Sequence, residues 1–219
     1  MPKLNKRRYS GRVHANKQWG NKRILPKNES FSDEEEMIAN IRIPKERIGV
    51  LVGKDGTTKS SIENISGCNL EVDSDEGDVT VIGDTITDAL KFAITQEVVK
   101  AIGRGFNPEK ALFLYNEGFQ LNVLSLREVA KKGSSRINQI KGRIIGTQGK
   151  TRTLIEEITE CFISVYGDTV SIIGDFVSMK YALEAVEMLI SGKKQRSVYS
   201  FLEKNAREMK SEKLSESFR

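Results

Sequence analysis

Two glycine tetrads carry the residue types most suited to chemistry in this chain. One is Gly-Lys-Asp-Gly, Gly53 to Gly56, and the other is Gly-Thr-Gln-Gly, Gly146 to Gly149. Glycine permits unusual backbone angles and close approach of a ligand. The helix expected after each tetrad directs free N–H groups and its positive dipole end toward it. Such a place is suited to binding a phosphate.

Other combinations that would indicate catalysis or metal binding are weaker. Gly146 to Thr151, GTQGKT, resembles a phosphate-binding P-loop, but that motif needs a glycine at position 144, which is isoleucine. His14 is the only histidine, so neither a Cys/His zinc cluster nor a Ser-His or Cys-His nucleophile pair is expected. The acidic group Asp73, Asp75, Glu76 and Asp78 fits a solvated turn. We therefore expect no enzyme activity, no cofactor and no metal.

The tetrads belong to a longer repeat. IGVLVGKDGTTKSSIENI, from Ile48 to Ile65, recurs 93 residues later as KGRIIGTQGKTRTLIEEI, from Lys141 to Ile158. Both copies continue through a cysteine to similar strand ends, VTVIGD (79–84) and VSIIGD (170–175). Self-similarity at a fixed spacing indicates a repeated structural unit. The chain is therefore predicted to contain two copies of one domain.

The first copy predicts one set of elements in order. We expect a strand at 37–43, a short helix at 47–52, a second helix at 57–66, two strands at 69–73 and 78–82, and a long closing helix. Ile62 and Ile65 are predicted to face the core. Asp84 is predicted to cap the closing helix, whose apolar positions are Ile86, Leu90, Ala93, Ile94 and Val98.

A connector and an insertion distinguish the second copy. Residues 103–118 predict a helix with Asn107 as its cap and Pro108 at its first position, apolar enough to pack the two domains together. After the strand 119–124, about fifteen extra residues predict an inserted helix at 126–132, a break at 133–135 and the tetrad helix at 136–145. Gly167 and Asp168 predict a tight hairpin turn. The closing helix is expected at 176–190.

The domain boundaries follow from these elements. They are an arm at 1–36, a first domain at 37–103, a connector at 104–118, a second domain at 119–192 and a C-terminal helix and tail at 193–219. Val198, Phe201, Leu202 and Met209 form a sparse apolar stripe, which favours docking of that helix on the second domain over docking on a partner.

Charge is distributed unevenly. The 219 residues hold 35 basic and 30 acidic side chains, a net charge of +5. Residues 1–28 hold nine of the basic ones and no acidic one, which leaves 26 basic and 30 acidic residues, or −4, for the rest. Such an arm predicts a disordered segment that orders on nucleic acid or on a ribosomal surface, with a passive solvated tail as the alternative. The acidic run Ser32 to Glu36 then indicates a boundary.

Composition excludes several other classes. No apolar run approaches the roughly 18 residues of a membrane span, and the N-terminus lacks the apolar core of a secretory signal. We therefore expect an intracellular, cytoplasmic protein without a membrane partner. Cys68 and Cys161 occupy equivalent positions of the two repeats, which predicts two small buried side chains and no disulfide.

The order of elements around each tetrad resembles the KH domain of the βααββα, or type I, kind. The resemblance implies an α+β fold with two tandem KH domains, each a three-stranded antiparallel sheet packed on helices. It also implies that each Gly-x-x-G loop grips the sugar-phosphate backbone of about four nucleotides of single-stranded RNA.

Candidate RNA-binding residues follow from this resemblance. In the second repeat they are Arg143, Ile145, Gly146, Thr147, Gln148, Gly149, Lys150 and Arg152, and in the first they are Gly53, Lys54, Asp55, Gly56 and Lys59. The second tetrad holds no acid and leads into two cations, whereas the first contains Asp55 and its domain carries the acidic hairpin. Since carboxylates disfavour nearby phosphates, we expect the second domain to supply the main grip. One of Ile144 and Ile145 is expected to line the groove for the bases.

A more specific resemblance covers about residues 37 to 210. Two KH-like repeats joined through RGFNPEKALFLYNEG, with the second closing as VSIIGDFVSMKYALEAVEMLISG, are similar to the archaeal partner-of-Nob, or Dim-two, ribosome assembly factors. The resemblance implies binding to the 3′-end region of small-subunit ribosomal RNA during maturation. It also implies the Nob endonuclease, the rRNA dimethyladenosine transferase and the α subunit of initiation factor two as partners. A KH-fold protein adaptor and a KH regulator of messenger RNA are the alternatives.

Overall fold

A computed structural model describes residues 36–84, 87–129 and 133–216 of the chain. The predicted basic arm lies outside these residues except for Glu36, so its predicted disorder and RNA contacts stay predictions. Ile86 of the predicted closing helix and the last three residues of the predicted inserted helix lie outside them as well.

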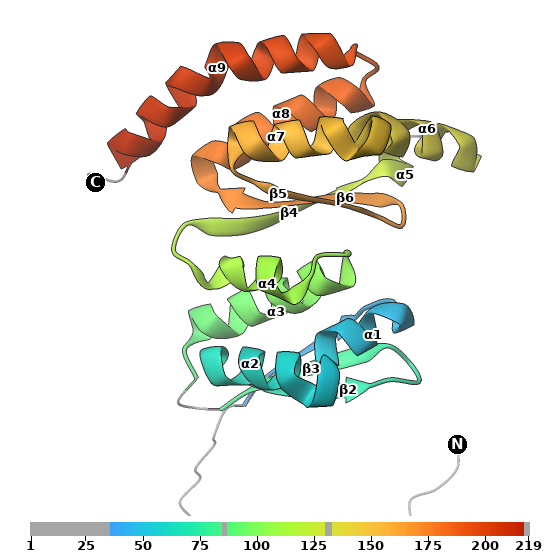
Figure 1. Cartoon of the computed structure of the whole chain (residues 1–219). Helices are drawn as coiled ribbons and strands as arrows, with labels where there is room; N and C mark the ends of the chain where they lie inside the picture. Colours follow the sequence, from blue (N-terminus) through green and yellow to red (C-terminus); the bar gives the residue numbers. More distant parts are fainter. Residues whose placement is uncertain (1–35, 85–86, 130–132, 217–219) are drawn as a thin grey trace, which may run out of the picture. The chain divides into compact units, whose positions relative to one another are not determined.

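The first repeat folds in the predicted order (Figure 1). Its elements are β1 (Met37–Arg42), α1 (Lys45–Val52), the 3₁₀ turn η1 (Lys54–Gly56), α2 (Thr57–Ser66), β2 (Asn69–Asp73), β3 (Asp78–Gly83) and α3 (Ala89–Gly103). The strands form an antiparallel sheet in the order β1-β3-β2, with Ile41 opposite Val79 and Leu70 opposite Val81. All four of these side chains are buried, so one face of the sheet packs against the helices.

The second repeat has the same topology with an insertion (Figure 1). Its elements are β4 (Phe119–Ser125), α5 (Leu126–Val129), α6 (Gly133–Ile145), η3 (Thr147–Gly149), α7 (Lys150–Thr159), β5 (Phe162–Tyr166), β6 (Thr169–Asp175) and α8 (Phe176–Ile190). The strand order is β4-β6-β5, again antiparallel. The predicted fold class, two α+β repeats with three-stranded antiparallel sheets, is confirmed.

A core of buried side chains fills each repeat. Leu51 and Ile62 belong to the first core, and their counterparts Ile144 and Ile155 belong to the second; all four have no exposed surface. Cys68 and Cys161 are buried free thiols, which confirms both the predicted burial and the predicted absence of a disulfide.

The connector packs the two repeats together. It consists of α4 (Pro108–Ala111) and η2 (Leu112–Tyr115), and the Asn107 side chain caps α4 as predicted, accepting a hydrogen bond from the Lys110 N–H at 3.1 Å. Phe113 of η2 contacts the rings of Phe119 and Phe162, with ring centroids 5.9 and 5.0 Å apart. Ile173 of β6 joins the core of the first repeat. The outer face of the second sheet is therefore covered by the connector.

Polar contacts cross the same boundary. The Arg47 guanidinium, held within the first repeat by a hydrogen bond from its Nε–H to the Ile102 carbonyl at 2.8 Å, lies over the ring of Tyr166, 5.8 Å from the centroid. The Tyr166 hydroxyl donates to Glu46, and the Ser164 hydroxyl donates to the Arg104 carbonyl at 2.9 Å. Hydrogen bonds thus fix the edge strand β5 against the end of α3 and the start of α1.

A last helix, α9 (Gln195–Glu216), docks on the second repeat. Val198, Leu202 and Met209 are buried, while Phe201 is half-buried against α7 and α8. The prediction that this helix packs on the second domain is confirmed.

Three of the apolar positions predicted for the helices of the first repeat are exposed. Ile65 is 43% exposed and Leu90 is 66% exposed, while Ala93 also faces solvent. Helix α2 buries Ile62 and Ser66, four residues apart, and α3 buries Thr95, Val98, Val99 and Ile102. The apolar spacing correctly predicted the helices but placed the buried stripe one position away from its true line.

The predicted cap of α3 is also wrong. Asp84 accepts hydrogen bonds from the Thr87 N–H and hydroxyl, both at 2.8 Å, whereas α3 begins only at Ala89 and is capped by Asp88, which accepts from the Leu90 N–H at 2.8 Å. The predicted break at 133–135 is instead the first turn of α6. Glycine and serine are common at helix N-termini as well as in breaks, which explains the second error.

Candidate nucleic-acid interface

The two tetrads adopt the same backbone. The first glycine has φ of 75° at Gly53 and 74° at Gly146, and the last has 77° at Gly56 and 80° at Gly149. The third residue is also left-handed, with φ of 53° at Asp55 and 54° at Gln148. Left-handed conformations are uncommon for residues with a side chain. Their repetition shows that the tetrads are two copies of one loop geometry.

Each glycine of the tetrad is required for a different reason. A Cβ at Gly53 would lie 2.8 Å from the Thr58 nitrogen, and one at Gly146 would lie 2.8 Å from the Thr151 nitrogen. The first glycine therefore lets the loop pass close to the following helix. At Gly56 and Gly149 there is open space, and the left-handed backbone alone favours glycine.

The helix after each tetrad starts without a side-chain cap. α2 and α7 each begin directly after the tetrad and run for ten residues, and neither has a side-chain cap at its preceding glycine. The first N–H of each helix donates to a carbonyl of the tetrad, Thr57 to Lys54 and Lys150 to Thr147. The positive dipole end of the helix still favours an anion at this start. The two middle residues of each tetrad are exposed. A phosphate could therefore approach the helix start without displacing a side chain.

Cations surround the second tetrad. Lys150 is exposed at the start of α7, and Arg152 is half-buried with its Nε 3.7 Å from the Glu156 carboxylate. Arg143 donates to the Lys193 carbonyl. Ile144 is fully buried, whereas Ile145 is half-buried and outside the core cluster. Of the two isoleucines, Ile145 is therefore the one whose position suits a groove.

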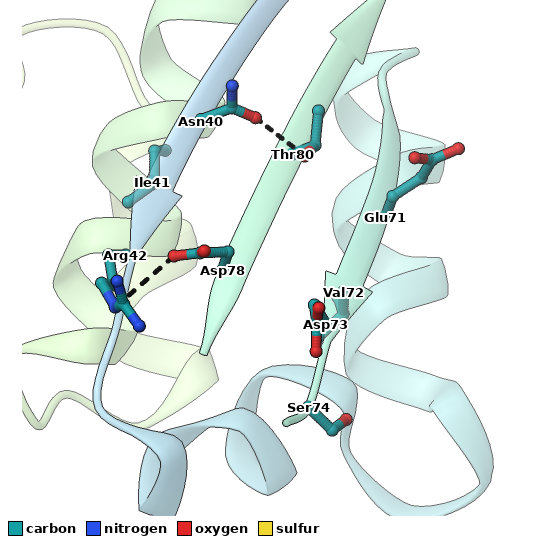
Figure 2. Close-up of a pocket in the computed structure, with 9 residues that line it drawn as sticks. All are labelled: Asn40, Ile41, Arg42, Glu71, Val72, Asp73, Ser74, Asp78 and Thr80. Carbon is teal, nitrogen blue, oxygen red and sulfur yellow. Dashed lines mark hydrogen bonds and ion pairs between the residues drawn. The ribbon is translucent and has the colours of Figure 1, made fainter. Parts of the chain in front are cut away.

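The first tetrad has a different charge environment. Its exposed middle residues are Lys54 and Asp55, and Lys59 is paired with Glu63 at 3.7 Å. On the outer face of the first sheet lies a depression of about 890 Å³ that includes Glu71, Asp73 and Asp78. Figure 2 shows their carboxylates along β2 and β3, with Arg42 paired to Asp78 at 3.6 Å. The first domain therefore presents carboxylates both in its tetrad and on the outer face of its sheet.

Two residues that the sequence reasoning missed brace the second tetrad. The Thr151 hydroxyl is 2.9 Å from both the Tyr199 hydroxyl and Gln195 Nε2, and Gln195 also donates to the Arg143 carbonyl at 3.2 Å. Both residues come from the first turns of α9. The only sequence signal for these contacts was the apolar stripe, which predicted that the helix docks on the second domain. Tyr199 is next in sequence to Val198, a buried residue of that stripe.

Thiol and metal-binding groups can be assessed separately in the described residues. Burial raises the pKa of Cys161 to about 12, so its thiol stays protonated. Residues 36–84, 87–129 and 133–216 contain no cluster of acidic, histidine or cysteine side chains that could hold a metal ion. In the same residues, no helix has the length and apolar character to cross a bilayer.

Comparisons with known proteins assign the family. Residues 120–207 match the family described as eukaryotic type KH domain, KH-domain type I, and residues 38–96 match the KH domain. KH domain-containing protein MJ0443 of Methanocaldococcus jannaschii is 43% identical over 81% of this chain and 78% of its own length. The pre-rRNA-processing protein pno1 of Aspergillus fumigatus is 32% identical over 52% of this chain, a match that spans 46% of that protein.

A solved structure is similar over most of the chain. It is the a/eIF2alpha-aDim2p-rRNA complex from Pyrococcus horikoshii, with 39% identity and a TM-score of 0.74 over 80% of this chain and 96% of that one. Two KH domains, the strand orders and these relatives agree with one another. The chain belongs to the archaeal Dim2/Pno1 family of tandem KH-domain proteins.

Proposed function

We propose that this protein binds single-stranded RNA mainly through its second KH domain and acts in maturation of the 3′-end region of small-subunit ribosomal RNA. The observation that carries the proposal is the second tetrad. It combines an uncapped helix start, a loop without acids and neighbouring cations at Lys150 and Arg152. Its relatives support the RNA class, since one is a pre-rRNA-processing protein and another was solved in an rRNA complex.

The remaining candidate residues have assigned roles within this proposal. The backbone of Gly146, Thr147, Gln148 and Gly149 contacts phosphate, Lys150 and Arg143 add positive charge, and Ile145 contacts a base. Gly53, Lys54, Asp55, Gly56 and Lys59 form the weaker site of the first domain. No catalytic role is assigned to any of them, because positioned donors and cations bind RNA without cleaving it.

Partners form a second part of the proposal. A link to the α subunit of initiation factor two is supported by the complex solved for the Pyrococcus protein. The Nob endonuclease and the rRNA dimethyladenosine transferase rest on the family resemblance alone. A role as an adaptor, in which the KH folds serve only as docking surfaces, predicts no direct RNA binding by the isolated protein.

A matched pair of variants tests the main grip. The double substitution Thr147→Asp with Gln148→Asp turns the second tetrad into Gly-Asp-Asp-Gly, and the single substitution Lys54→Asp turns the first into the same sequence. The native Asp55 already adopts φ of 53°, so aspartate fits the backbone at position 148. We expect at least a tenfold loss of affinity for the second-tetrad variant, about 1.4 kcal/mol or more. The first-tetrad variant should lose much less.

The measurement is fluorescence anisotropy with a labelled single-stranded RNA that matches the 3′ end of small-subunit rRNA. A scrambled RNA of equal length measures sequence preference, and circular dichroism confirms that both variants are folded. A larger loss for the Lys54→Asp variant would assign the grip to the first domain. Absence of RNA binding by the unmodified protein would favour the adaptor.

A further inference from the structure

A polar pocket lies where the connector meets the edge of the second sheet. It has a volume of about 280 Å³, slightly below the range of roughly 300 to 1,000 Å³ that is typical of ligand pockets. One side is formed by residues 105–107 and Lys110 of the connector region, and the other by Arg152 of α7 and residues 163–166 of β5. The pocket therefore combines a side chain of α7, the helix after the second tetrad, with side chains of the connector.

Two cations share one carboxylate beside this pocket. Lys110 Nζ lies 3.6 Å from Glu156 Oε1, and Arg152 Nε lies 3.7 Å from Glu156 Oε2. Glu156 Oε1 also accepts a hydrogen bond from the Ile163 N–H at 2.8 Å. Within the described residues, Arg152 Nε is buried and has no hydrogen-bond partner. Lys110, Arg152 and Glu156 together therefore carry one net positive charge. The Arg152 Nε–H is a donor that an added ligand could use.

The first repeat contains the same arrangement with one cation fewer. Lys59 pairs with Glu63 at 3.7 Å, and Glu63 accepts from the Leu70 N–H at 2.9 Å. These three residues correspond to Arg152, Glu156 and Ile163. In the described part of the chain, Lys59 is the one cation paired with Glu63. The second cation, Lys110, is an addition that the connector makes to the second repeat.

The pocket lies within reach of RNA held at the second tetrad. Arg152 is in the first turn of α7, three residues after Gly149, and one helical turn spans about 5.4 Å. β5 is an edge strand, and its Ile163 N–H points away from β6 toward Glu156. Because backbone groups alternate along an antiparallel strand, the N–H and C=O of Val165 face the same free side. They offer hydrogen bonds to the edge of a base.

We propose that Lys110 binds an RNA phosphate as the strand leaves the groove of the second domain, so that the connector is part of the RNA site. The inference rests on the proposed RNA-binding function and extends it by at least one nucleotide subsite. Lys110 is well suited to this role because its ion pair with Glu156 is long and its side chain is 41% exposed. Phosphate can therefore replace or share the carboxylate contact.

Charge-neutralising variants test the subsite. Lys110→Gln removes the proposed phosphate contact, and Lys110→Arg keeps a cation in its place. Lys100→Gln is the matched control, since Lys100 is 46% exposed, is also paired with a glutamate, at 2.7 Å, and lies outside the pocket. The probe is a labelled 12-nucleotide single-stranded RNA of randomised sequence, titrated by anisotropy at several salt concentrations.

Three readings are expected from this titration. Lys110→Gln should bind about 3- to 10-fold more weakly and lower the steepness of log K against log salt by about 0.7, the value for one single-strand phosphate. Lys110→Arg should keep the affinity and slope of the unmodified protein, and Lys100→Gln should match it. A purely structural Lys110–Glu156 pair predicts a lower melting temperature with an unchanged slope.

The outcomes separate this inference from the proposed function. If Lys110→Gln behaves like Lys100→Gln while the second-tetrad variant still loses binding, the connector subsite is wrong and the main grip stands. If the unmodified protein binds neither RNA, both are wrong.

Discussion

The two KH domains share one tetrad backbone but differ in what surrounds it. Both loops give their first, third and fourth residues positive φ angles that agree within a few degrees. Around the second loop lie Lys150, Arg152 and the bracing residues Gln195 and Tyr199. The first loop contains Asp55, and its domain carries an acidic depression on the outer face of its sheet. The backbone is therefore set by local glycine chemistry, whereas the surroundings of each loop come partly from neighbouring residues and partly from the distant helix α9.

The C-terminal helix adds a second difference, because it covers an apolar surface that is exposed in the first domain. Ile158 and Tyr181 of the second domain belong to an apolar group that also contains Met209 of α9. Their counterparts in the first domain are Ile65 and Leu90, which are 43% and 66% exposed. The same helix face is thus covered in one copy and open in the other. A repeated sequence predicts a repeated fold, but not a repeated environment.

The largest expected effects come from paired truncations before each tetrad. Leu51 and Ile144 occupy equivalent, fully buried positions, so Leu51→Ala and Ile144→Ala should each cost about 2 to 5 kcal/mol of unfolding free energy. Val52 and Ile145 occupy the next position and are half-buried. Val52→Ala and Ile145→Ala should therefore cost less stability. Denaturant unfolding measures all four.

RNA affinity then separates the two half-buried positions. Ile145→Ala should weaken binding to the rRNA-matched probe, since Ile145 is free of the core and next to the second tetrad. Val52→Ala should leave that affinity unchanged, because Val52 packs against the first core. Equal affinity losses for these two variants would show that both domains contribute grooves, and no loss for Ile145→Ala would remove its groove assignment.

Local patterns predicted the elements well because each depends on nearby residues. Asn107 with Pro108, the turn at Gly167 and Asp168, and the span of α8 all follow from caps, turn residues and helical spacing. The errors at Ile65 and Leu90 arose from the same method. Spacing shows that a helix has an apolar stripe, but which edge of that stripe is buried depends on the packing of other elements.

The candidate site was predictable only in part for the same reason. The tetrad residues, Lys150 and Arg152 are adjacent in sequence, so their shared location follows from the motif. Lys110 is 46 positions before Glu156, and Tyr199 is 48 positions after Thr151. Their contacts exist because the connector and α9 fold back on the second domain. One sequence contains no local pattern that states such contacts.

A smaller effect is expected from removing one brace of the second tetrad. Tyr199→Phe deletes a hydroxyl 2.9 Å from the Thr151 hydroxyl, and Tyr115→Phe deletes one 2.9 Å from the Thr95 hydroxyl, away from either tetrad. Each substitution should cost about 0.5 to 1.5 kcal/mol of stability. If α9 holds the second tetrad in place, only Tyr199→Phe should also weaken RNA binding. Equal affinities for the two variants would limit Tyr199 to a structural role.

The smallest effect concerns an ion group that ties α9 to the second domain. Lys213 Nζ lies 2.6 Å from Glu160 and 3.1 Å from Asp175, whose side chain caps α8 by accepting from the Ser178 N–H at 2.9 Å. Burial raises the pKa of the Asp175 carboxyl, but the hydrogen bonds from Ser178 and Lys213 outweigh it and hold that pKa below its usual value. Burial lowers the pKa of Lys213, and its bonds to Glu160 and Asp175 more than reverse this.

The signs of these shifts set the pH dependence of stability. Because the folded-state pKa of Asp175 is lowered, its contribution is complete above the usual carboxyl pKa and is lost as pH falls through the lowered value. The contribution of Lys213 is complete below its usual pKa and is lost only as pH rises through the raised value, so it does not change in acid.

Lys213→Met should therefore lower the melting temperature at neutral pH by the equivalent of about 1 kcal/mol or less, since both partners are partly exposed. This difference from the unmodified protein should shrink as pH falls from the usual carboxyl pKa, about 3.9, through the lowered pKa of Asp175. Lys210→Met, an equal loss of charge from an exposed position of the same helix, controls for net charge. A difference that stays constant across that range would mean that Lys213 stabilises the second domain through its aliphatic chain. The ion pair with α9 would then not stabilise the Asp175 cap of α8.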